Sequence, residues 1–580
     1  MHFLSFWVYK LEKASRRLRY YLTPHPGLDA TYWKQQGGGE VRVLSPPLPL
    51  ARAEALCNDL QNATGSSRLE AQLIQRAWQS VGQSEVIAAD PVTPLPHWEG
   101  QAEATHLYDL LLGRILLLSE VEQAVAAGRL FLAYPLPELL HYLYLEAKVQ
   151  CRAAVVEQPK RRCLRCGSYD LQPATCLECG AEQVWSCQNC GAMGQAKSCT
   201  PLYACATTSL AQPRAVELNL PASLTPAQAR VAKQLQQFLQ QARYTTCLFW
   251  AVCGAGKTEA TLPAVQQVLA GGGRVLWASP RRDLVTELTP RLVNALPELE
   301  VAALHGQVRE RFTDAPLVIA TTHQALRLFS AFDLVILDEV DAFPYTENPM
   351  LELAVLRALR PGGKLIYLTA TPTPKLLQQV QRGQTQQVLL PVRWHGRPLP
   401  EPVIRLLRLP RPQQASWQVP NALARILTDS LERDLCQVLI YVPSVQLAEQ
   451  VGRGLQAHFA RQDLPDWVEY IHAADAQRDV KRGRFFAGEF PILVTTTLLE
   501  RGITLPRVNI IVLYADRMQI FSEPVLAQIA GRAGRAANYP TGQVYFLAET
   551  RSRAMVTACR QIQTLNKAAR QIAAAALKED

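Results

Sequence analysis

The sequence predicts an α/β protein with two tandem, doubly wound parallel-sheet domains, preceded by a cysteine zinc ribbon and a mostly helical N-terminal region. Three features predict this fold. After Leu224, two series of short apolar runs alternate with helical patterns, a proline-rich connector separates the two series, and paired cysteines precede both. Such runs are typical of strands buried on both faces of a parallel sheet. At 580 residues the chain is also too long for one core, since domains usually hold roughly 100–200 residues.

The two series of apolar runs set the expected domain boundaries. The first series is CLFWAV, RVLWAS, LVIAT, LVILD and KLIYLTA, and the second is QVLIYV, ILVTT, NIIVLY and GQVYFLA. The connector PVRWHGRPLPEPV at 391–403 lies between them. We expect an N-terminal region at 1–158, a zinc-binding domain at 159–210, and α/β domains at 211–395 and 396–580. Two such domains in tandem form a cleft between them.

Composition excludes several classes of protein. With 48% hydrophobic and 19% charged residues, the chain is neither disordered nor low in core-forming material. Its formal charge of +10 is compatible with a polyanionic partner but does not identify one. Lys10, Glu12 and Arg16 are among the charges that interrupt the apolar opening, which excludes a signal h-region and a membrane span there. We therefore expect a cytoplasmic protein, with peripheral contact at the inner face of the cell membrane as its closest approach to lipid.

A phosphate-binding loop follows the first apolar run. The segment 251–258 reads AVCGAGKT, between a predicted strand and a predicted helix. Gly254, Ala255 and Gly256 would let backbone N–H groups converge on phosphate oxygens at the helix N-terminus. Lys257 would place a positive charge near the β and γ phosphates, and the Thr258 hydroxyl would ligate Mg²⁺. The pattern predicts an ATP site.

Two further motifs complete a nucleoside triphosphatase. Asp338 and Glu339 follow a buried strand, where Asp338 would hold Mg²⁺ and Glu339 would polarise the attacking water. In the second domain, Arg532 and Arg535 lie three residues apart, which on a helix would place them on one face. Arginines presented across the cleft would neutralise charge on the γ-phosphate.

The cysteine cluster predicts zinc. Eight of the 14 cysteines fall between residues 163 and 205, and six of these form pairs with two intervening residues. Two such knuckles complete a tetrahedral Zn²⁺ site, and in a reducing compartment metal is favoured over disulfides. The candidate ligands are Cys163, Cys166, Cys176, Cys179, Cys187, Cys190, Cys199 and Cys205.

The order of motifs resembles that of superfamily 2 helicases of the DEAD/DEAH type, whose two domains are RecA-like. The series is TPAQ, AGKT, ASPRR, TTHQ, DEVD, TAT, YVPS, TTTLLERG and QIAGRAGR. Several segments, including WAVCGAGKTE, DEVDAFPY and RPLPEP, together with the cysteine ribbon, are similar to the ComFA family of late competence proteins. This resemblance covers roughly residues 162–548.

The resemblance implies roles for individual residues. Gln228 would read the adenine edge, and Thr369 and Thr371 would couple hydrolysis to domain movement. The phosphate backbone of one DNA strand would contact Arg281, Thr321, Thr322 and Thr496. Backbone contacts carry no sequence information, so binding should be general and salt-sensitive. Thr504 stands where an acidic residue usually holds the ribose, which leaves ribose selectivity open.

The resemblance also bears on the zinc ligands. In the family the site is built from two knuckles, which here match Cys163–Cys166 and Cys187–Cys190. The extra pair, Cys176 and Cys179, could join Cys199 and Cys205 in a second, interleaved site similar to that of the primosomal helicase PriA.

The resulting hypothesis is a DNA-stimulated ATPase that uses ATP, Mg²⁺ and Zn²⁺ to move along single-stranded DNA and drive uptake of transforming DNA. The family suggests the competence protein ComFC and DNA-uptake channel proteins as partners. Two alternatives stay open: a replication-restart or repair helicase of PriA type, and a zinc-ribbon DNA-binding adaptor with a vestigial ATPase.

Overall fold

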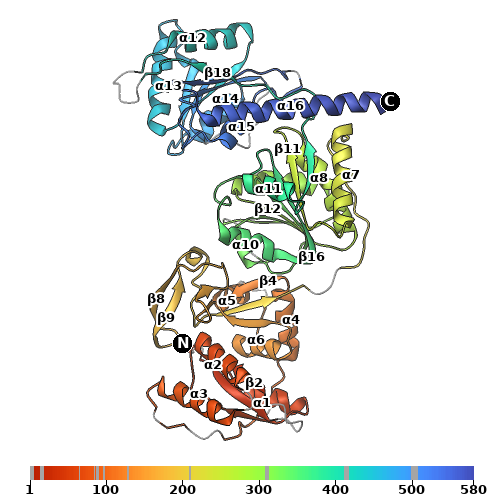
Figure 1. Ribbon diagram of the computed structural model, residues 1–580, viewed down its shortest axis with the longest axis vertical. Helices are drawn as coiled ribbons and strands as arrows, with labels where there is room; N and C mark the ends of the chain where they lie inside the picture. Colours follow the sequence, from red (N-terminus) through yellow and green to blue (C-terminus); the bar gives the residue numbers. More distant parts are fainter. Residues whose placement is uncertain are drawn as a thin grey trace.

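The computed structural model arranges the chain as an elongated molecule, with its structural units stacked along the long axis in chain order (Figure 1). It describes residues 5–12, 19–63, 66–83, 85–86, 90–95, 98–126, 130–207, 211–306, 312–410, 417–497, 507–537 and 539–579. The N-terminal units lie at one end, the first α/β domain in the middle and the second at the other end.

The N-terminal region contains both helices and strands, whereas the sequence predicted mainly helices. Strands β1 (Trp7–Glu12), β2 (Arg19–Thr23) and β3 (Glu40–Val43) form an antiparallel sheet in the order β2-β1-β3. The helices are α1 (Pro26–Gln35), α2 (Leu50–Asn62), α3 (Ser67–Gln79), α4 (Gln101–Leu111), α5 (Leu118–Ala124) and α6 (Leu136–Leu145).

The cysteine segment is joined to the residues that precede it by a shared sheet. Strand β10 (Pro201–Cys205) pairs antiparallel with both β4 (Arg114–Leu117) and β5 (Gln150–Ala153). The segment between them contains the short pair β6 (Val155–Val156) and β7 (Arg162–Cys163), and a hairpin of β8 (Leu171–Cys176) and β9 (Ala181–Cys187). Residues on both sides of position 158 therefore form one structural unit.

The first α/β domain is a seven-stranded parallel sheet in the order β13-β14-β12-β15-β16-β11-β17. Its strands are β11 (Thr246–Ala251), β12 (Val275–Ser279), β13 (Val301–Leu304), β14 (Leu317–Thr321), β15 (Phe332–Asp338), β16 (Leu359–Thr369) and β17 (Gln386–Leu390).

Its helices divide between the two faces of the sheet. Core residues of α7 (Pro226–Gln240), α8 (Lys257–Ala270) and α9 (Arg282–Ala295) pack on one face. Those of α10 (Pro349–Ala358) and α11 (Pro374–Gln381) pack on the other. Four cysteines of the ribbon and residues of β4 belong to this second core, so the cysteine unit is built onto that face of the sheet.

The second α/β domain is a six-stranded parallel sheet in the order β18-β23-β22-β19-β21-β20. The sequence predicted a parallel sheet here and four of its strands, and β18 and β20 are additional. Its strands are β18 (Val403–Leu406), β19 (Gln437–Tyr441), β20 (Val468–Ile471), β21 (Ile492–Thr495), β22 (Val508–Leu513) and β23 (Val544–Ala548). Its helices are α12 (Asn421–Thr428), α13 (Val445–Ala460), α14 (Arg478–Phe486), α15 (Glu523–Ala530) and the long α16 (Arg553–Glu579).

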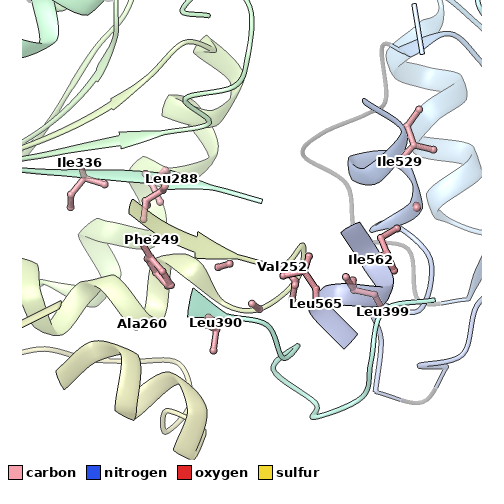
Figure 2. Close-up of a cluster of buried hydrophobic side chains, with 14 of the residues drawn as sticks. Phe249, Val252, Ala260, Leu288, Ile336, Leu390, Leu399, Ile529, Ile562 and Leu565 are labelled. Carbon is pink, nitrogen blue, oxygen red and sulfur yellow. The ribbon is translucent and has the colours of Figure 1, made fainter. Parts of the chain in front are cut away.

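A continuous apolar cluster joins the two α/β domains. Figure 2 shows Val252, which follows β11, beside Leu565 of α16 and Leu399 of the connector. Val252 and Leu565 are buried at 1% and 4% exposure, so water is excluded where they meet. The contact holds the second domain next to the residues that follow β11.

Candidate ATP site and metal centre

The phosphate loop connects β11 to α8. Gly254 and Gly256 have φ angles of 78° and 75°, in the left-handed region that favours glycine. A Cβ on Gly256 would lie 2.2 Å from Nε2 of Gln228, so a side chain at this position would displace the amide of Gln228. The two glycines bring the chain sharply into the start of α8, the geometry in which backbone N–H groups bind phosphate.

Gln228 ties α7 to this loop. Its Nε2 donates to the carbonyl of Ala255 at 2.9 Å, and its Oε1 accepts from the backbone N–H of Thr225 at 2.9 Å. The side chain is buried at 6% exposure. Gln228 thus positions the phosphate loop, and its contact with adenine stays a prediction.

The acidic pair lies opposite Lys257. Asp338 ends β15, and its Oδ1 is 3.5 Å from Nζ of Lys257. Burial alone disfavours a charged lysine, but Asp338 and Glu339 outweigh it and raise the pKa of Lys257 above its usual value. With Thr258 on the first turn of α8, the Asp338 carboxylate offers the hard oxygen donors that Mg²⁺ prefers. The residues therefore fit a nucleotide with Mg²⁺.

Arg281 faces the acidic pair as well. Its Nε lies 3.7 Å from Oε2 of Glu339. Glu339 itself has a φ of 56°, a conformation that L residues seldom adopt, and its backbone N–H donates to Oδ1 of Asp338 at 2.9 Å. In this structure Arg281 is beside the carboxylate expected to activate water, and its predicted role at a DNA strand stays untested.

The two arginines of the second domain reach the phosphate loop from a turn. The expectation that they share a helical face is wrong, because α15 ends at Ala530 and Gly534 has a φ of 64°. Arg535 Cγ would lie 3.8 Å from a Cβ placed on Gly254. Burial, and then repulsion by Arg535, lowers the pKa of Arg532 to about 10, while Glu339 acts in the opposite direction. Both arginines are therefore close to the atoms that would hold and hydrolyse ATP.

A hydrogen-bond network crosses between the domains beside this site. Asp341 accepts from the hydroxyls of Thr369 at 2.6 Å and Thr371 at 2.7 Å. Gln528 of the second domain donates to Asp341 at 2.6 Å and to the Thr371 hydroxyl at 3.1 Å. The two threonines that were expected to couple hydrolysis to domain movement thus touch the second domain through one carboxylate and one amide.

The predicted DNA contacts lie after strands of the two sheets. Thr321 ends β14, and the backbone N–H of Thr322 donates to the carbonyl of Ser279 at 3.0 Å. Thr496 follows β21 in the second domain. Thr504, which bears on ribose selectivity, lies outside the described residues.

Four cysteine sulfurs form a compact group. The Sγ atoms of Cys163, Cys166, Cys187 and Cys190 all lie within 4.8 Å of one another, and all four residues are buried. The Cys163–Cys190 and Cys166–Cys187 sulfurs are 3.8 and 3.5 Å apart. Zn–S bonds of about 2.3 Å in a tetrahedron place sulfurs about 3.8 Å apart, whereas a disulfide requires about 2.05 Å. This donor set fits Zn²⁺.

Buried arginines fasten this group to the first α/β domain. Glu120 of α5 accepts from Arg165 at 2.7 Å and from Arg327 at 2.6 Å. Arg357 of α10 donates to the carbonyls of Leu164 at 3.2 Å and of Arg165 at 2.8 Å. The cysteine knuckle is therefore connected to the short helix at Gln324–Arg327, which follows Thr322.

Three more cysteines gather elsewhere, but Cys205 does not join them. Cys176, Cys179 and Cys199 have sulfurs within 4.8 Å of one another. Cys205 lies in β10, and its thiol donates to the Lys148 carbonyl at 3.5 Å. The predicted grouping of Cys205 with these cysteines is wrong, because β10 pairs with β4 and β5 and places the residue in a different core.

Comparison with known proteins places the chain among the helicases. The DEAD/DEAH box helicase model matches residues 225–380, and the helicase conserved C-terminal domain model matches residues 418–537. The chain is therefore an ATP-hydrolysing superfamily 2 helicase, a class that uses a nucleotide with Mg²⁺ and binds nucleic acid.

Further matches identify the family. The competence protein ComFA N-terminal domain model matches residues 101–204. The chain is 34% identical over 417 residues to competence protein ComFA of Bacillus subtilis, covering 72% of this chain and 88% of that protein. It is 36% identical over 420 residues to ComFA of Streptococcus pneumoniae, covering 71% and 92%. The chain belongs to the ComFA family of competence proteins.

The family match begins earlier than the sequence motifs indicated, at residue 101 rather than near residue 162. Among solved structures, the chain is similar to Mycobacterium smegmatis helicase Lhr bound to ssDNA and AMP-PNP, with 20% identity and a TM-score of 0.42 over 59% of this chain and 48% of that one.

In the part of the chain that the structure describes, each helix is too short or too polar to cross a bilayer.

Sequence reasoning missed several residues of the site. Asp341 belongs to the motif DEVD and Gln528 to QIAGRAGR, but their contact depends on the folded structure and has no signal in either motif. Arg393 of the connector is buried at 2% exposure and donates to the carbonyls of Ala533 at 2.8 Å and Gly531 at 3.0 Å, which supports the turn that carries Arg532. A buried arginine in a proline-rich connector has no local sequence signal.

Proposed function

We propose that this protein is a DNA-stimulated ATPase that translocates along single-stranded DNA and drives the uptake of transforming DNA. Family membership supports the link to competence. The observation that carries the proposal is the contact of Gln528 with Asp341 and Thr371, since it connects the second domain to the ATP site of the first. Hydrolysis that changes the charge near this contact would open and close the cleft.

Movement along a strand follows if each domain holds the backbone of the strand in turn. Thr321 and Thr322 belong to the first domain and Thr496 to the second. When the cleft closes, the spacing between the two sets of contacts shortens, and the strand advances as one set releases it. Contacts of this kind to phosphates do not depend on the base sequence, and they weaken as the salt concentration rises.

Arg532 and Arg535 would supply the charge that makes hydrolysis depend on closure. They belong to the second domain, so a fully closed cleft is needed to place them on the γ-phosphate. DNA that favours the closed state would therefore stimulate turnover. The partners that we propose are single-stranded DNA, the protein ComFC and proteins of the DNA-uptake channel.

The four-cysteine group would hold one Zn²⁺ and stabilise the face of the first domain that leads to Thr322. Cys163→Ser should weaken Zn²⁺ binding at this group, because a serine hydroxyl is a much poorer zinc ligand than a thiolate. Arg327 links this unit to the predicted DNA-binding site at Thr322. In the variant, DNA affinity should therefore fall more than the ATPase rate measured without DNA. Equal DNA affinity in the variant would refute this role.

The test of the main proposal compares ATP turnover with no DNA, with circular single-stranded DNA and with linear duplex. We expect strong stimulation by the single strand and weak stimulation by duplex. Glu339→Gln, which keeps the carboxylate of Asp338, should bind ATP and DNA without turnover. Unwinding of forked duplexes at a rate matching ATP turnover would favour a replication-restart helicase instead, and absence of ATP turnover would favour the adaptor.

A further inference from the structure

A second sulfur group lies at the tip of the β8–β9 hairpin. Cys176 ends β8, Cys179 lies in the turn, and Cys199 comes from the segment that leads into β10. The three sulfurs lie within 4.8 Å of one another, with those of Cys176 and Cys199 3.6 Å apart. The hairpin base is at the first group, since Leu171 pairs with Cys187. The two groups therefore occupy opposite ends of one hairpin.

The sulfur spacing fits metal binding. A separation of 3.6 Å is far longer than the disulfide bond of about 2.05 Å and close to the roughly 3.8 Å between thiolates on one Zn²⁺. Nζ of Lys197 lies 3.8 Å from the sulfur of Cys176.

The backbone holds these cysteines together without relying on a large apolar core. The N–H of Ser198 donates to the carbonyl of Trp185 at 2.9 Å, and the N–H of Trp185 donates to the Ser198 hydroxyl at 3.1 Å. This pair places Cys199 against β9. The apolar cluster around the three sulfurs is small, and Val184 is its buried aliphatic residue. Metal binding would add stability that such a small apolar cluster cannot provide by itself.

One side of the group faces a cavity. Cys179 and Cys199 line a space of about 440 Å³ together with Glu122, Glu178 and Lys197. Cys205 was expected to complete the group, but its thiol donates a hydrogen bond to the backbone carbonyl of Lys148 instead. Among the described residues, three sulfurs therefore approach from the protein side, and the fourth tetrahedral direction is left to the cavity.

We propose that Cys176, Cys179 and Cys199 hold a second Zn²⁺ whose fourth coordination position faces this cavity and takes an exchangeable water. The thiols would bind as thiolates and release their protons to solvent, with no change of oxidation state. Three thiolates and Zn²⁺ leave one net negative charge, which Lys197 offsets. A zinc ion with three protein ligands keeps an open position, so this ion should exchange faster than the four-sulfur one.

The first test counts metal in the purified full chain under reducing conditions, by elemental mass spectrometry. We expect two Zn²⁺ per chain in the wild type and one in Cys199→Ser. Cys205→Ser is the matched control, a buried cysteine outside the group, and should keep two. One Zn²⁺ in the wild type, retained in Cys199→Ser, would overturn the proposal. If Cys199→Ser does not fold, the wild-type count and that of Cys205→Ser decide.

The second test measures exchange at the open position. The chelator 4-(2-pyridylazo)resorcinol should remove one equivalent quickly and the other slowly. The double variant Glu122→Gln, Glu178→Gln should keep both ions, because the proposal assigns the fourth position to water. Equal release rates, or loss of one ion in the double variant, would overturn the open position. These measurements use neither ATP nor DNA, so their outcome is separate from that of the proposed function.

Discussion

Glu120→Ala should loosen the attachment of the four-cysteine unit to the ATPase. Glu120 accepts from two buried arginines, at 2.7 Å from Arg165 and 2.6 Å from Arg327, and its side chain is 5% exposed. The side chains of Arg165 and Arg327 are 0% and 10% exposed. Removing the carboxylate leaves two buried guanidinium groups without the anion that they share. Breaking a buried ion pair in this way typically costs about 3–5 kcal/mol.

Hydrogen exchange resolved by peptide is the suitable assay, because it reports the opening free energy of each segment of a multidomain chain. A cost of about 3 kcal/mol should accelerate exchange roughly 10²-fold in peptides that contain Leu164 or Arg327. The control is Glu352→Ala. Glu352 pairs with Lys375 at 2.8 Å, but their side chains are 40% and 66% exposed, so its loss should cost at most about 1 kcal/mol.

An anchoring role for Glu120 is excluded if Glu120→Ala accelerates exchange no more than Glu352→Ala does. Glu120→Gln should fall between the wild type and Glu120→Ala, because its amide oxygen can still accept from one arginine. If Glu120→Gln matched Glu120→Ala, the charge of Glu120 would be the whole effect.

Three further predictions concern the ATP site. Lys257→Ala should weaken ATP binding and lower turnover together, whereas Glu339→Gln should bind ATP without hydrolysing it. Turnover is measured by phosphate release, and near-normal turnover in Glu339→Gln would contradict the assignment of Glu339 as the catalytic carboxylate. Arg532→Ala should lower the turnover rate by roughly 10²–10⁵ with a smaller change in ATP affinity, and a loss confined to affinity would make it a ground-state ligand. Gln528→Ala removes a hydrogen bond to the charged Asp341, worth about 1.5–3 kcal/mol, so DNA-stimulated turnover should fall about 10–100-fold. Gln528→Glu should fall further through repulsion, and activity above that of Gln528→Ala would contradict the contact.

Local patterns predicted the parts of the site that depend on neighbouring residues. The phosphate loop could be recognised because Gly254, Gly256 and Lys257 act within one strand-loop-helix unit. The four-sulfur group could be recognised because two residues between cysteines fix their geometry. In both cases the chemistry requires the spacing, so the spacing is visible in the sequence.

Contacts between distant segments could not be predicted in this way. Gln528 and Asp341 are 187 positions apart in the sequence and meet only where the two α/β domains contact each other. Cys205 was misassigned because proximity in sequence does not show that β10 pairs with β4. The strands β1 and β2 have no clear alternation, since aromatic and charged residues mix in WVYKLE and RYYLT, and the N-terminal sheet was missed.

Translocation along a single strand of DNA can be tested by the kinetics with which the protein displaces streptavidin from biotinylated single-stranded DNA. On oligonucleotides of increasing length, with the protein preloaded and ATP added, we expect a lag before displacement that lengthens with the strand. Glu339→Gln should give no displacement although it binds the same DNA. ATP turnover stimulated by the single strand, with displacement that is absent or has no length-dependent lag, would contradict the claim.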